Sequence, residues 1–484
     1  MHRALIIGTH ETARIVAAEL KANSAHGFVP AGFIEDRPSN AESNGIPILG
    51  SLSDLAIVAK AHDVRHVVTD RQNSATSLRE LFSVCRREQL TIRIAVFNGG
   101  PADSIDQRTF EIRPVQIEDL LRHGQIQPNG NGLEERIRRQ RVLVTGAGGS
   151  IGSELCRQIA RYQPAQLILL GHGEHSIFTL ASELSWRFPS LSIVRVIADV
   201  RDQRRLEQAF SDLLPTMVFH TAAHKHVALM EENIEEAVTN NVLGTRNLVN
   251  AGLAAGVQSF VLISTDKAVK PTSVMGATKR IAELIVGQAD RLAEGSFVSV
   301  RFGNVLGSRG SVLGIFREQI ARGGPVTVTH PEMSRYFMTI DEAVHLVLQA
   351  TMLGEGGETF VLDMGEPIKI VDIARDLIEL SGFEVDQDIS IKFTGVRPGE
   401  KLTEELILES NDYKSTSHPK IYVLRKDTCA SSETEAASTL NNQLTELVDA
   451  ARHAKRDLIQ HYLKRIVPEY EGPATLSAGV QRAH

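Results

Sequence analysis

One stretch of the sequence decides the fold: residues 141–152 read RVLVTGAGGSIG. The aliphatic run at 141–145 is typical of a buried strand, and three glycines follow it, Gly146, Gly149 and Gly152, at the spacing Gly-x-x-Gly-x-x-Gly. A strand, a glycine-rich turn and a helix in this order are typical of a dinucleotide-binding Rossmann unit. The glycines permit a tight turn, a close approach of the backbone to a pyrophosphate, and close packing of the helix on the strand.

The helix expected after this turn begins at Ser150 and Ile151, whose free N–H groups and positive dipole end would meet the phosphates. A ribose-binding acidic residue is expected about 20 residues further on. Gly171 occupies that position, Glu174 lies three residues later, and no arginine stands there to receive a 2′-phosphate. We therefore expect NAD as the cofactor, with NADP as the alternative.

Two more strand ends are expected to contact the same cofactor. Asp199 and Val200 end one strand, where the carboxylate can meet the adenine amino group. Ala222 and Ala223 follow another strand, and their small side chains let a ligand pass close to the backbone.

Strands and helices also alternate before residue 141, which indicates right-handed crossovers and a second parallel sheet. In the first hundred residues we expect strands at 4–7, 29–34, 46–49, 67–68 and 92–97, and helices at 12–21, 52–61 and 77–88. The predicted fold class is α/β, with two Rossmann-like, doubly wound parallel sheets and a helical C-terminal segment. The predicted boundaries are a CoA-binding-like Rossmann domain at 1–98, a linker at 99–140 with a short helix at 115–121, a catalytic domain at 141–405 and the helical segment at 406–484.

The first domain carries only a weak nucleotide signal, because the turn after its first strand, at residues 8–13, holds one glycine instead of three. Its role therefore stays open between binding a regulatory nucleotide and a structural or docking role.

The composition narrows the class of protein. With 42% hydrophobic and 23% charged residues among 484, the chain is globular, and a net charge of −7 argues against nucleic-acid binding. No run of 18 apolar residues is present, so we expect no membrane insertion. Three widely spaced cysteines are typical of reduced thiols in a cytoplasmic protein.

Three histidines lie close together in the sequence, at His220, His224 and His226. Their spacing fits no standard zinc motif, and no cysteine or carboxylate cluster accompanies them. We therefore expect no metal and interpret His224, with the neighbouring Lys225, as polar lining of the pocket.

The segment at 262–267, LISTDK, is followed by VMGATK at 274–279. With the glycine motif, it resembles an extended short-chain dehydrogenase/reductase. In that superfamily a Tyr-x-x-x-Lys pair stands here, and the resemblance implies that Lys279 holds the nicotinamide ribose. Met275 stands in the place of the tyrosine, and a thioether cannot exchange a proton.

Further segments narrow the resemblance: HTAAHKHV at 220–227, STDKA at 264–268, RFGNVLGS at 301–308, TVTHPEMSRYFM at 327–338 and RPGEKL at 397–402. Together with Met275 they resemble the polysaccharide-biosynthesis UDP-N-acetylglucosamine 4,6-dehydratases, specifically the configuration-retaining branch with Met for Tyr. The resemblance covers residues 1 to about 470. Larger members begin with transmembrane helices, so we expect this chain to be the soluble form. By analogy alone we also expect a homo-oligomer.

The resemblance implies an internal redox reaction. The sugar loses hydride from carbon 4 to NAD, water is eliminated across carbons 5 and 6, and hydride returns to carbon 6. We assign Asp266 as the acid for the departing 6-hydroxyl and Lys267 as the base for the carbon 5 proton, with the opposite assignment left open. Burial and the nearby Lys279 would favour the neutral amine that Lys267 needs. Thr265, through water, or Asp266 itself would accept the 4-hydroxyl proton.

The resemblance also implies contacts to UDP-N-acetylglucosamine. Asn304 would lie near the sugar or diphosphate, Arg335 and Arg397 would meet the phosphates, and Glu400 would accept from the uridine ribose. These residue types suit the roles, because arginine binds diphosphate by paired hydrogen bonds and a carboxylate accepts from two hydroxyls.

Two other functions remain open on the sequence. The first alternative is an inverting dehydratase/5-epimerase or a 4-epimerase on the same nucleotide sugar, although relatives with those activities keep the tyrosine that Met275 replaces. Alternatively it is an inactive nucleotide-sugar-binding regulator, which the intact Asp266, Lys267 and Lys279 argue against.

Overall fold

The computed structural model describes residues 1–35, 42–43, 45–70, 75–98, 109–120, 132–406, 413–424 and 433–472. The contacts divide the chain into two compact units. The first unit comprises Met1–Pro128 with Asp376–Phe383, and the second comprises Asn129–Arg375 with Glu384–His484.

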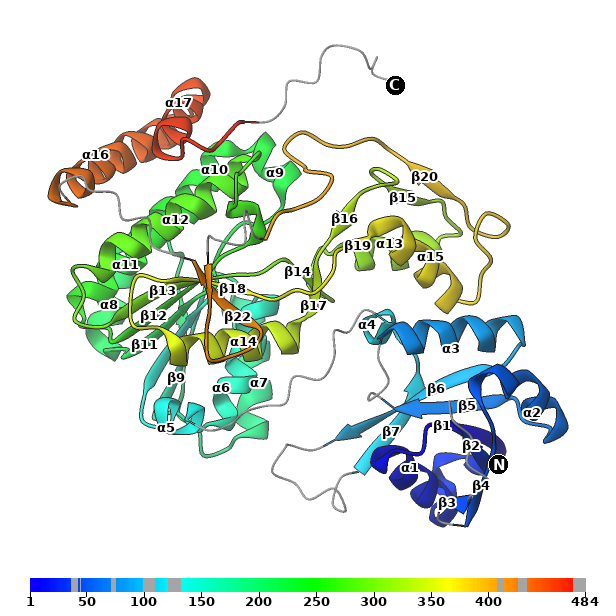
Figure 1. The fold of residues 1–484 in the computed structure, drawn as a ribbon. Coiled ribbons are helices and arrows are strands. Elements are labelled where there is room, and N and C mark those ends of the chain that lie inside the picture. Colours follow the sequence, from blue (N-terminus) through cyan, green and yellow to red (C-terminus); the bar gives the residue numbers. More distant parts are fainter. Residues whose placement is uncertain are drawn as a thin grey trace. The chain divides into compact units, whose positions relative to one another are not determined.

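The first unit holds a seven-stranded sheet in the order β3-β4-β2-β1-β5-β6-β7, in which the strands from β4 to β6 run parallel (Figure 1). The strands are β1 His2–Ile7, β2 Phe28–Ile34, β3 Glu42–Ser43, β4 Ile46–Gly50, β5 His66–Asp70, β6 Thr91–Asn98 and β7 Thr109–Pro114. The helices are α1 Glu11–Ala22, α2 Leu55–Ala61, α3 Ala75–Arg87 and α4 Ile117–Leu120. Each strand and helix predicted in the first hundred residues is present, and the predicted Rossmann-like sheet is confirmed.

The edge strand β7 was not predicted. It lies in the segment expected to be a linker at 99–140, and it pairs antiparallel with β6 along its whole length, from Arg93 opposite Pro114 to Asn98 opposite Thr109. An antiparallel edge strand needs no crossover helix, so it lacks the alternation on which the prediction relied. Residues 121–131, which include the rest of the expected short helix at 115–121, lie outside the described residues.

The second unit holds a nine-stranded sheet in the order β10-β9-β8-β11-β12-β13-β18-β22-β21. The strands are β8 Arg141–Thr145, β9 Gln166–Gly171, β10 Ile193–Ile197, β11 Met217–His220, β12 Ser259–Ile263, β13 Ser296–Arg301, β18 Thr359–Leu362, β21 Tyr413–Ser415 and β22 Ile421–Leu424. All pairs from β10 to β18 are parallel, and the chain order reverses between β8 and β11. Ligands bind at such a reversal in doubly wound sheets, at the carboxyl ends of the strands.

Helices cover both faces of this sheet. Helices α6, α7 and α14 lie together on one face, and α8, α11 and α12 lie on the other (Figure 1). Their bounds are α6 Ser150–Arg161, α7 Glu174–Arg187, α8 Gln203–Leu213, α11 Gly244–Ala254, α12 Val274–Asp290 and α14 Ile340–Leu353, and the short α5 spans Leu133–Ile137. The second predicted Rossmann-like sheet is therefore also confirmed.

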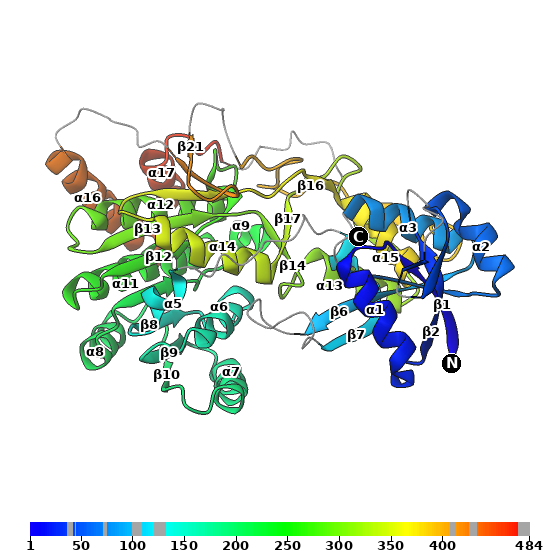
Figure 2. The ribbon, with the colours of Figure 1, turned by 60° about the horizontal axis from the view of Figure 1, so that its bottom comes forward.

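Three two-stranded sheets extend this unit beyond the large sheet: β14 with β17, β15 with β20, and β16 with β19. Their bounds are β14 Asn304–Leu306, β15 Val326–Val328, β16 Ser334–Arg335, β17 Phe337–Thr339, β19 Ile368–Lys369 and β20 Ile391–Phe393. Helix α13 spans Val312–Ala321, and helix α15 spans Ile370–Leu380, of which the residues from Asp376 onward belong to the first unit (Figure 2).

The C-terminal segment is not helical throughout, which corrects the expectation for residues 406–484. Strands β21 and β22 pair antiparallel with each other, and β22 pairs antiparallel with β18, so the large sheet extends past residue 405. Helices α16 Glu433–Arg452 and α17 Arg456–Ile466 then pack on α10 Ile234–Val238, and α17 also contacts α12. Leu447 and Leu463 of this helical pair are fully buried in the same core as α12. None of the helices in the described ranges is long and apolar enough to span a membrane.

A buried ion pair fixes helix α12 against the strand ends beside it. The Arg301 guanidinium at the end of β13 donates two hydrogen bonds to the Glu283 carboxylate of α12, at 2.7 and 2.5 Å. The Ser264 hydroxyl, just after β12, donates to the same carboxylate at 2.6 Å. Glu283 and Arg301 are only 4% and 5% exposed, so three elements share one desolvated charge pair.

Removing the Glu283 charge should destabilise the second unit. In Glu283→Gln the Arg301 guanidinium stays buried without its countercharge, and we expect the free energy of unfolding to fall by about 3–5 kcal/mol. Urea unfolding followed by circular dichroism measures this change. The matched control is Glu318→Gln, since Glu318 pairs with Arg322 on the surface, and there the change should stay below about 1 kcal/mol. Equal stability of the two variants would contradict the structural role of the pair.

Candidate active site

The carboxyl ends of β8, β11, β12 and β13 surround a cavity of about 560 Å³ in the second unit. Most of the residues predicted for the site line it: Gly149, Ser150, Ile151, Gly152, Ala223, His224, Lys225, Thr265, Lys267, Met275, Lys279 and Asn304. Eight predicted residues do not line it: Gly146, Asp199, Val200, Ala222, Asp266, Arg335, Arg397 and Glu400.

The glycine turn has the geometry that the sequence predicts. Gly146 has a φ of +61°, and a Cβ there would lie 2.9 Å from the Ala222 backbone, so this glycine and Ala222 hold two strand ends close together. A Cβ on Gly152 would lie 2.3 Å from the Gly146 carbonyl oxygen, which requires glycine for the packing of helix on turn. Helix α6 begins at Ser150 after Gly149, and no side-chain hydrogen bond caps its first turn. The N–H groups at this end are therefore available to an anion.

The charge of the cavity also suits anions. Its lining includes three lysines and one arginine, namely Lys225, Lys267, Lys279 and Arg309, and two histidines, His224 and His226, whose pKa burial lowers. No aspartate or glutamate belongs to that described lining. Burial, together with the charge of Lys267, lowers the pKa of Lys225. A ligand with several phosphate charges relieves the repulsion among these groups.

An acid–base cluster stands in the wall of the cavity, in the short helical turn Asp266–Ala268 after β12. The Lys267 Nζ donates to Asp266 Oδ1 at 3.0 Å and to Asn304 Oδ1 at 3.1 Å, and the Thr265 hydroxyl donates to Asp266 Oδ1 at 2.7 Å. Asp266 Oδ2 is buried and has no hydrogen-bond partner among the described residues. A Cβ on Gly303 would lie 3.3 Å from that oxygen, so the glycine leaves room beside it on the cavity side.

Helix α12 brings Met275 and Lys279 to the same cavity. The Lys279 Nζ donates to the Ile263 carbonyl at the end of β12, at 2.7 Å. Burial lowers the pKa of Lys279 to about 8, against an opposing influence of Glu283. Met275 is 2% exposed and lines the cavity, four residues before Lys279 on the same helix.

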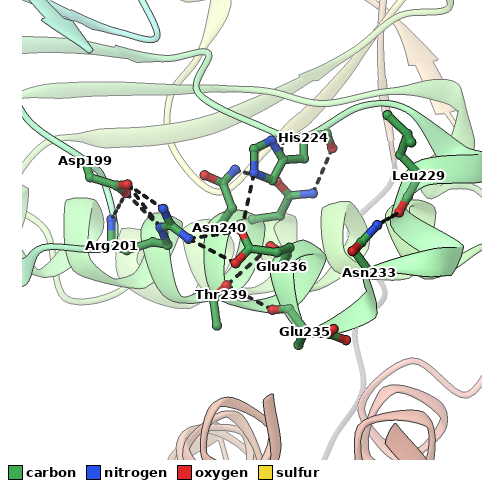
Figure 3. A network of polar contacts seen from close by, with 10 residues as sticks. Asp199, Arg201, His224, Leu229, Asn233, Glu235, Glu236, Thr239 and Asn240 are labelled. Carbon is green, nitrogen blue, oxygen red and sulfur yellow. Dashed lines mark hydrogen bonds and ion pairs between the residues drawn. The ribbon is translucent and has the colours of Figure 1, made fainter. Parts of the chain in front are cut away.

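Asp199 lies outside the cavity lining, in a polar network drawn in Figure 3. The Arg201 guanidinium donates to the Asp199 carboxylate at 2.7 Å and to Glu236 at 3.0 Å, so Arg201 lies between the two carboxylates (Figure 3). Hydrogen bonds from Arg201 lower the pKa of Asp199. His224 approaches the same Glu236 at 3.9 Å. An adenine amino group bound at Asp199 would therefore share this carboxylate with Arg201, a neighbour that the sequence analysis did not single out.

Three residues expected to bind the substrate do not line the cavity. Arg335 is 7% exposed, and its guanidinium donates to the backbone carbonyls of Ser334, Lys401 and Leu402 at 2.7–3.0 Å. These bonds use three of the five N–H donors of the guanidinium. Arg397 is exposed and Glu400 half-buried, and neither lines the cavity, although Glu400 Oε2 is buried without a partner among the described residues.

A loop that the sequence analysis passed over closes one side of the cavity. Ser308 and Arg309 line it, and the Arg309 N–H donates to the Ser150 hydroxyl at 3.0 Å. The Lys225 Nζ donates to the Ser308 hydroxyl at 3.2 Å. The signal is present in the sequence, because GSRGS at 307–311 overlaps the end of the RFGNVLGS segment and places two glycines around an arginine.

Comparison with known proteins places the chain in a family. The model of the family described as "Polysaccharide biosynthesis protein" matches residues 142–426. The "Probable polysaccharide biosynthesis protein EpsC" of Bacillus subtilis (strain 168) is 45% identical over 426 residues, which cover 87% of this chain and 71% of that relative. The "UDP-N-acetylglucosamine 4,6-dehydratase (inverting)" of Campylobacter jejuni subsp. jejuni serotype O:2 is 31% identical, over 59% of this chain and 83% of its own length.

Among solved structures, the X-ray structure of Pen from Bacillus thuringiensis matches with a TM-score of 0.55 and 32% identity. The match covers 63% of this chain and 98% of the Pen chain. The chain belongs to the polysaccharide biosynthesis protein family.

Proposed function

We propose that this protein is a hydro-lyase that converts UDP-N-acetylglucosamine to UDP-2-acetamido-2,6-dideoxy-4-hexulose, with retention of configuration at carbon 5. One observation carries the proposal: Lys267, hydrogen-bonded to Asp266, and Met275 line the same cavity. The cavity thus combines an acid–base pair suited to eliminating water with a side chain that cannot transfer a proton. The family membership and the named dehydratase relative support the same reaction class.

The residues around the glycine turn fit a nicotinamide dinucleotide, with NAD preferred over NADP. The first turn of α6 would bind the pyrophosphate through the N–H groups at Ser150 and Ile151, and Lys279 would hold the nicotinamide ribose. When bound, such a dinucleotide supplies a hydride acceptor that the reaction regenerates. The carboxylates of Asp199 and Glu236 already neutralise Arg201, which argues against a 2′-phosphate site at that arginine.

The hydrogen bond between Lys267 and Asp266 explains how a base and an acid can arise together. Moving one proton along this 3.0 Å contact gives a neutral amine on Lys267 and a carboxylic acid on Asp266. Lys267 then takes the carbon 5 proton, and Asp266 protonates the departing 6-hydroxyl. Asp266 holds only one proton at a time, so if Lys267 is neutral from the outset, that proton comes instead from the 4-hydroxyl through the Thr265 hydroxyl, 2.7 Å from the same carboxylate.

The retaining outcome is favoured because Met275 offers no second proton donor. Inversion needs a proton delivered to carbon 5 from the face opposite Lys267, and a thioether cannot supply it. Inversion is the competing outcome, since the Campylobacter jejuni relative is named an inverting 4,6-dehydratase.

Incubation with UDP-N-acetylglucosamine and NAD in deuterated water, followed by proton and carbon NMR, tests the proposal. We expect a 4-keto-6-deoxy sugar with deuterium at carbon 5 and unchanged configuration there, because Lys267 exchanges its proton with solvent before returning it. Inverted carbon 5 would make the chain an inverting enzyme, and unchanged substrate would refute the dehydration.

The control for this experiment is Lys267→Ala. This variant should release no 4-keto product, with a loss of at least about a thousandfold, because the carbon 5 proton has no acceptor. It should still bind the dinucleotide, since Lys267 is not part of the glycine turn. Near-wild-type turnover in Lys267→Ala would contradict its assignment as the base.

Affinity for NAD should depend on pH through Lys279. Because the pKa of this amine is lowered to about 8, it is an ammonium below that pH and loses its charge above it. Charge-assisted hydrogen bonds to the ribose then weaken, so affinity should fall by about tenfold between pH 7 and pH 9.5. Titration calorimetry measures this change. In Lys279→Met the affinity should be low at both pH values, and a flat profile in the wild-type protein would contradict the role of Lys279.

A further inference from the structure

One buried carboxyl group beside the acid–base cluster has no role in the reaction described above. Glu404 is 4% exposed, and its Oε1 lies 4.0 Å from the Lys267 Nζ and 3.7 Å from the Arg335 guanidinium. It does not line the cavity, so it reaches the reacting sugar only through Lys267. Burying a carboxylate costs free energy unless cations compensate it, so its position between two cations requires an explanation.

The backbone around Glu404 is held firmly in place. Thr403 forms a β-bridge to Ser334, and the Ser334 N–H donates to the Leu402 carbonyl at 2.9 Å. The Lys401 Nζ donates to the Val269 carbonyl at 3.1 Å, two residues after Lys267. The segment that carries Glu404 is thus attached both to β16 and to the chain that carries Lys267.

Arg335 does not need Glu404 to hold its place. Its guanidinium already donates to the carbonyls of Ser334, Lys401 and Leu402 at hydrogen-bond distance, whereas the contact to Glu404 is longer, at 3.7 Å. A role limited to fixing Arg335 therefore leaves the closeness of Glu404 to Lys267 unexplained.

We propose that Glu404 is a positioning residue of the acid–base centre, whose carboxylate stabilises the positive charge that develops on Lys267 as this amine takes the carbon 5 proton. The proposal rests on the proposed function. In that step the bond between carbon 5 and hydrogen breaks, and the proton bonds to the Lys267 Nζ. The electron pair forms the bond between carbons 5 and 6, and the 6-oxygen leaves as water with the proton of Asp266.

Electrostatics supports the stabilisation of a positively charged Lys267 by the Glu404 carboxylate. An opposite charge about 4 Å away in a desolvated site raises the pKa of a cationic group by about one to three pH units. The groups that face Glu404 are Lys267 and Asp266 from the turn after β12, Arg335 from β16, and Lys401 from its own segment. Burial raises the pKa of Glu404, and Asp266 raises it further, while the three cations oppose this.

The test compares Glu404→Gln with Glu405→Gln, a matched change at the exposed neighbouring glutamate. In Glu404→Gln we expect kcat to fall at least about tenfold, the equivalent of one pKa unit of lost charge stabilisation. KM and the amount of bound NAD should stay within about threefold of the wild-type values. The kinetic isotope effect from deuterium at carbon 5 should increase, because proton removal becomes slower.

The pH profile separates this role from a merely structural one. In the wild-type enzyme kcat should fall as the pH drops through the raised pKa of Glu404, because protonation removes the stabilising charge. Glu404→Gln should lack this acid limb. Glu404→Asp, which keeps the charge, should retain kcat within about threefold. An equal loss in the Asp and Gln variants, or a wild-type kcat and profile in Glu404→Gln, would overturn the proposal.

A second measurement does not use the reaction at all. Competitive acetylation between pH 6 and pH 10, read by mass spectrometry against the exposed Lys60, gives the pH at which Lys267 is half-reactive. This midpoint should fall by about one pH unit in Glu404→Gln and stay unchanged in Glu405→Gln. An unchanged midpoint in Glu404→Gln would refute the link to Lys267. Unchanged sugar with the wild-type protein would instead refute the proposed dehydration.

Discussion

Helix α12 is held to the ends of β12 and β13 by the buried pair of Glu283 and Arg301, and the geometry of the cavity depends on this placement. The helix carries Met275 and Lys279, while the strand it is tied to leads directly into Thr265, Asp266 and Lys267. A shift of α12 would break the bond from Lys279 to the Ile263 carbonyl and separate the two lysines from their shared cavity. The charge pair is desolvated, and the Ser264 hydroxyl and the Arg280 guanidinium also donate to the Glu283 carboxylate.

The elements that could be predicted from sequence are those whose physical cause is local. The glycines at 146 and 152 are required by contacts within the turn and to the next strand end, and a Cβ on Gly149 would make a tight contact of 3.1 Å with the Gly146 carbonyl oxygen. Lys267 lies in the short turn directly after the buried strand β12, and Lys279 lies in the second turn of α12, the next helix, so their approach to one cavity follows from strand order and helical spacing. Parallel strands joined by helices also leave a clear alternation, and both sheets were recognised from it.

The strands and site residues that the sequence does not predict depend on contacts between distant segments, and such contacts leave no local pattern in the sequence. Strand β7 needs only an antiparallel neighbour, and β22 joins the large sheet about 60 residues after β18, its partner. Arg335 has the residue type of a phosphate ligand, yet it does not line the cavity, and two of its N–H groups donate to the backbone of the returning segment at 401–402. Glu404 and Arg201 were overlooked for the same reason, since each gains its importance from a charged group brought beside it by folding.

We propose that a single cavity of the second unit holds the sugar between Lys267, with Asp266 hydrogen-bonded behind it, and the inert Met275. A crystal structure of the protein with NAD and UDP-N-acetylglucosamine bound tests this claim most directly. We expect the Lys267 Nζ within about 3.5 Å of sugar carbon 5, the Asp266 carboxyl beside the 6-oxygen and the Met275 thioether against the ring. A hexose ring bound outside this cavity, or turned so that carbon 5 faces away from Lys267, would contradict it.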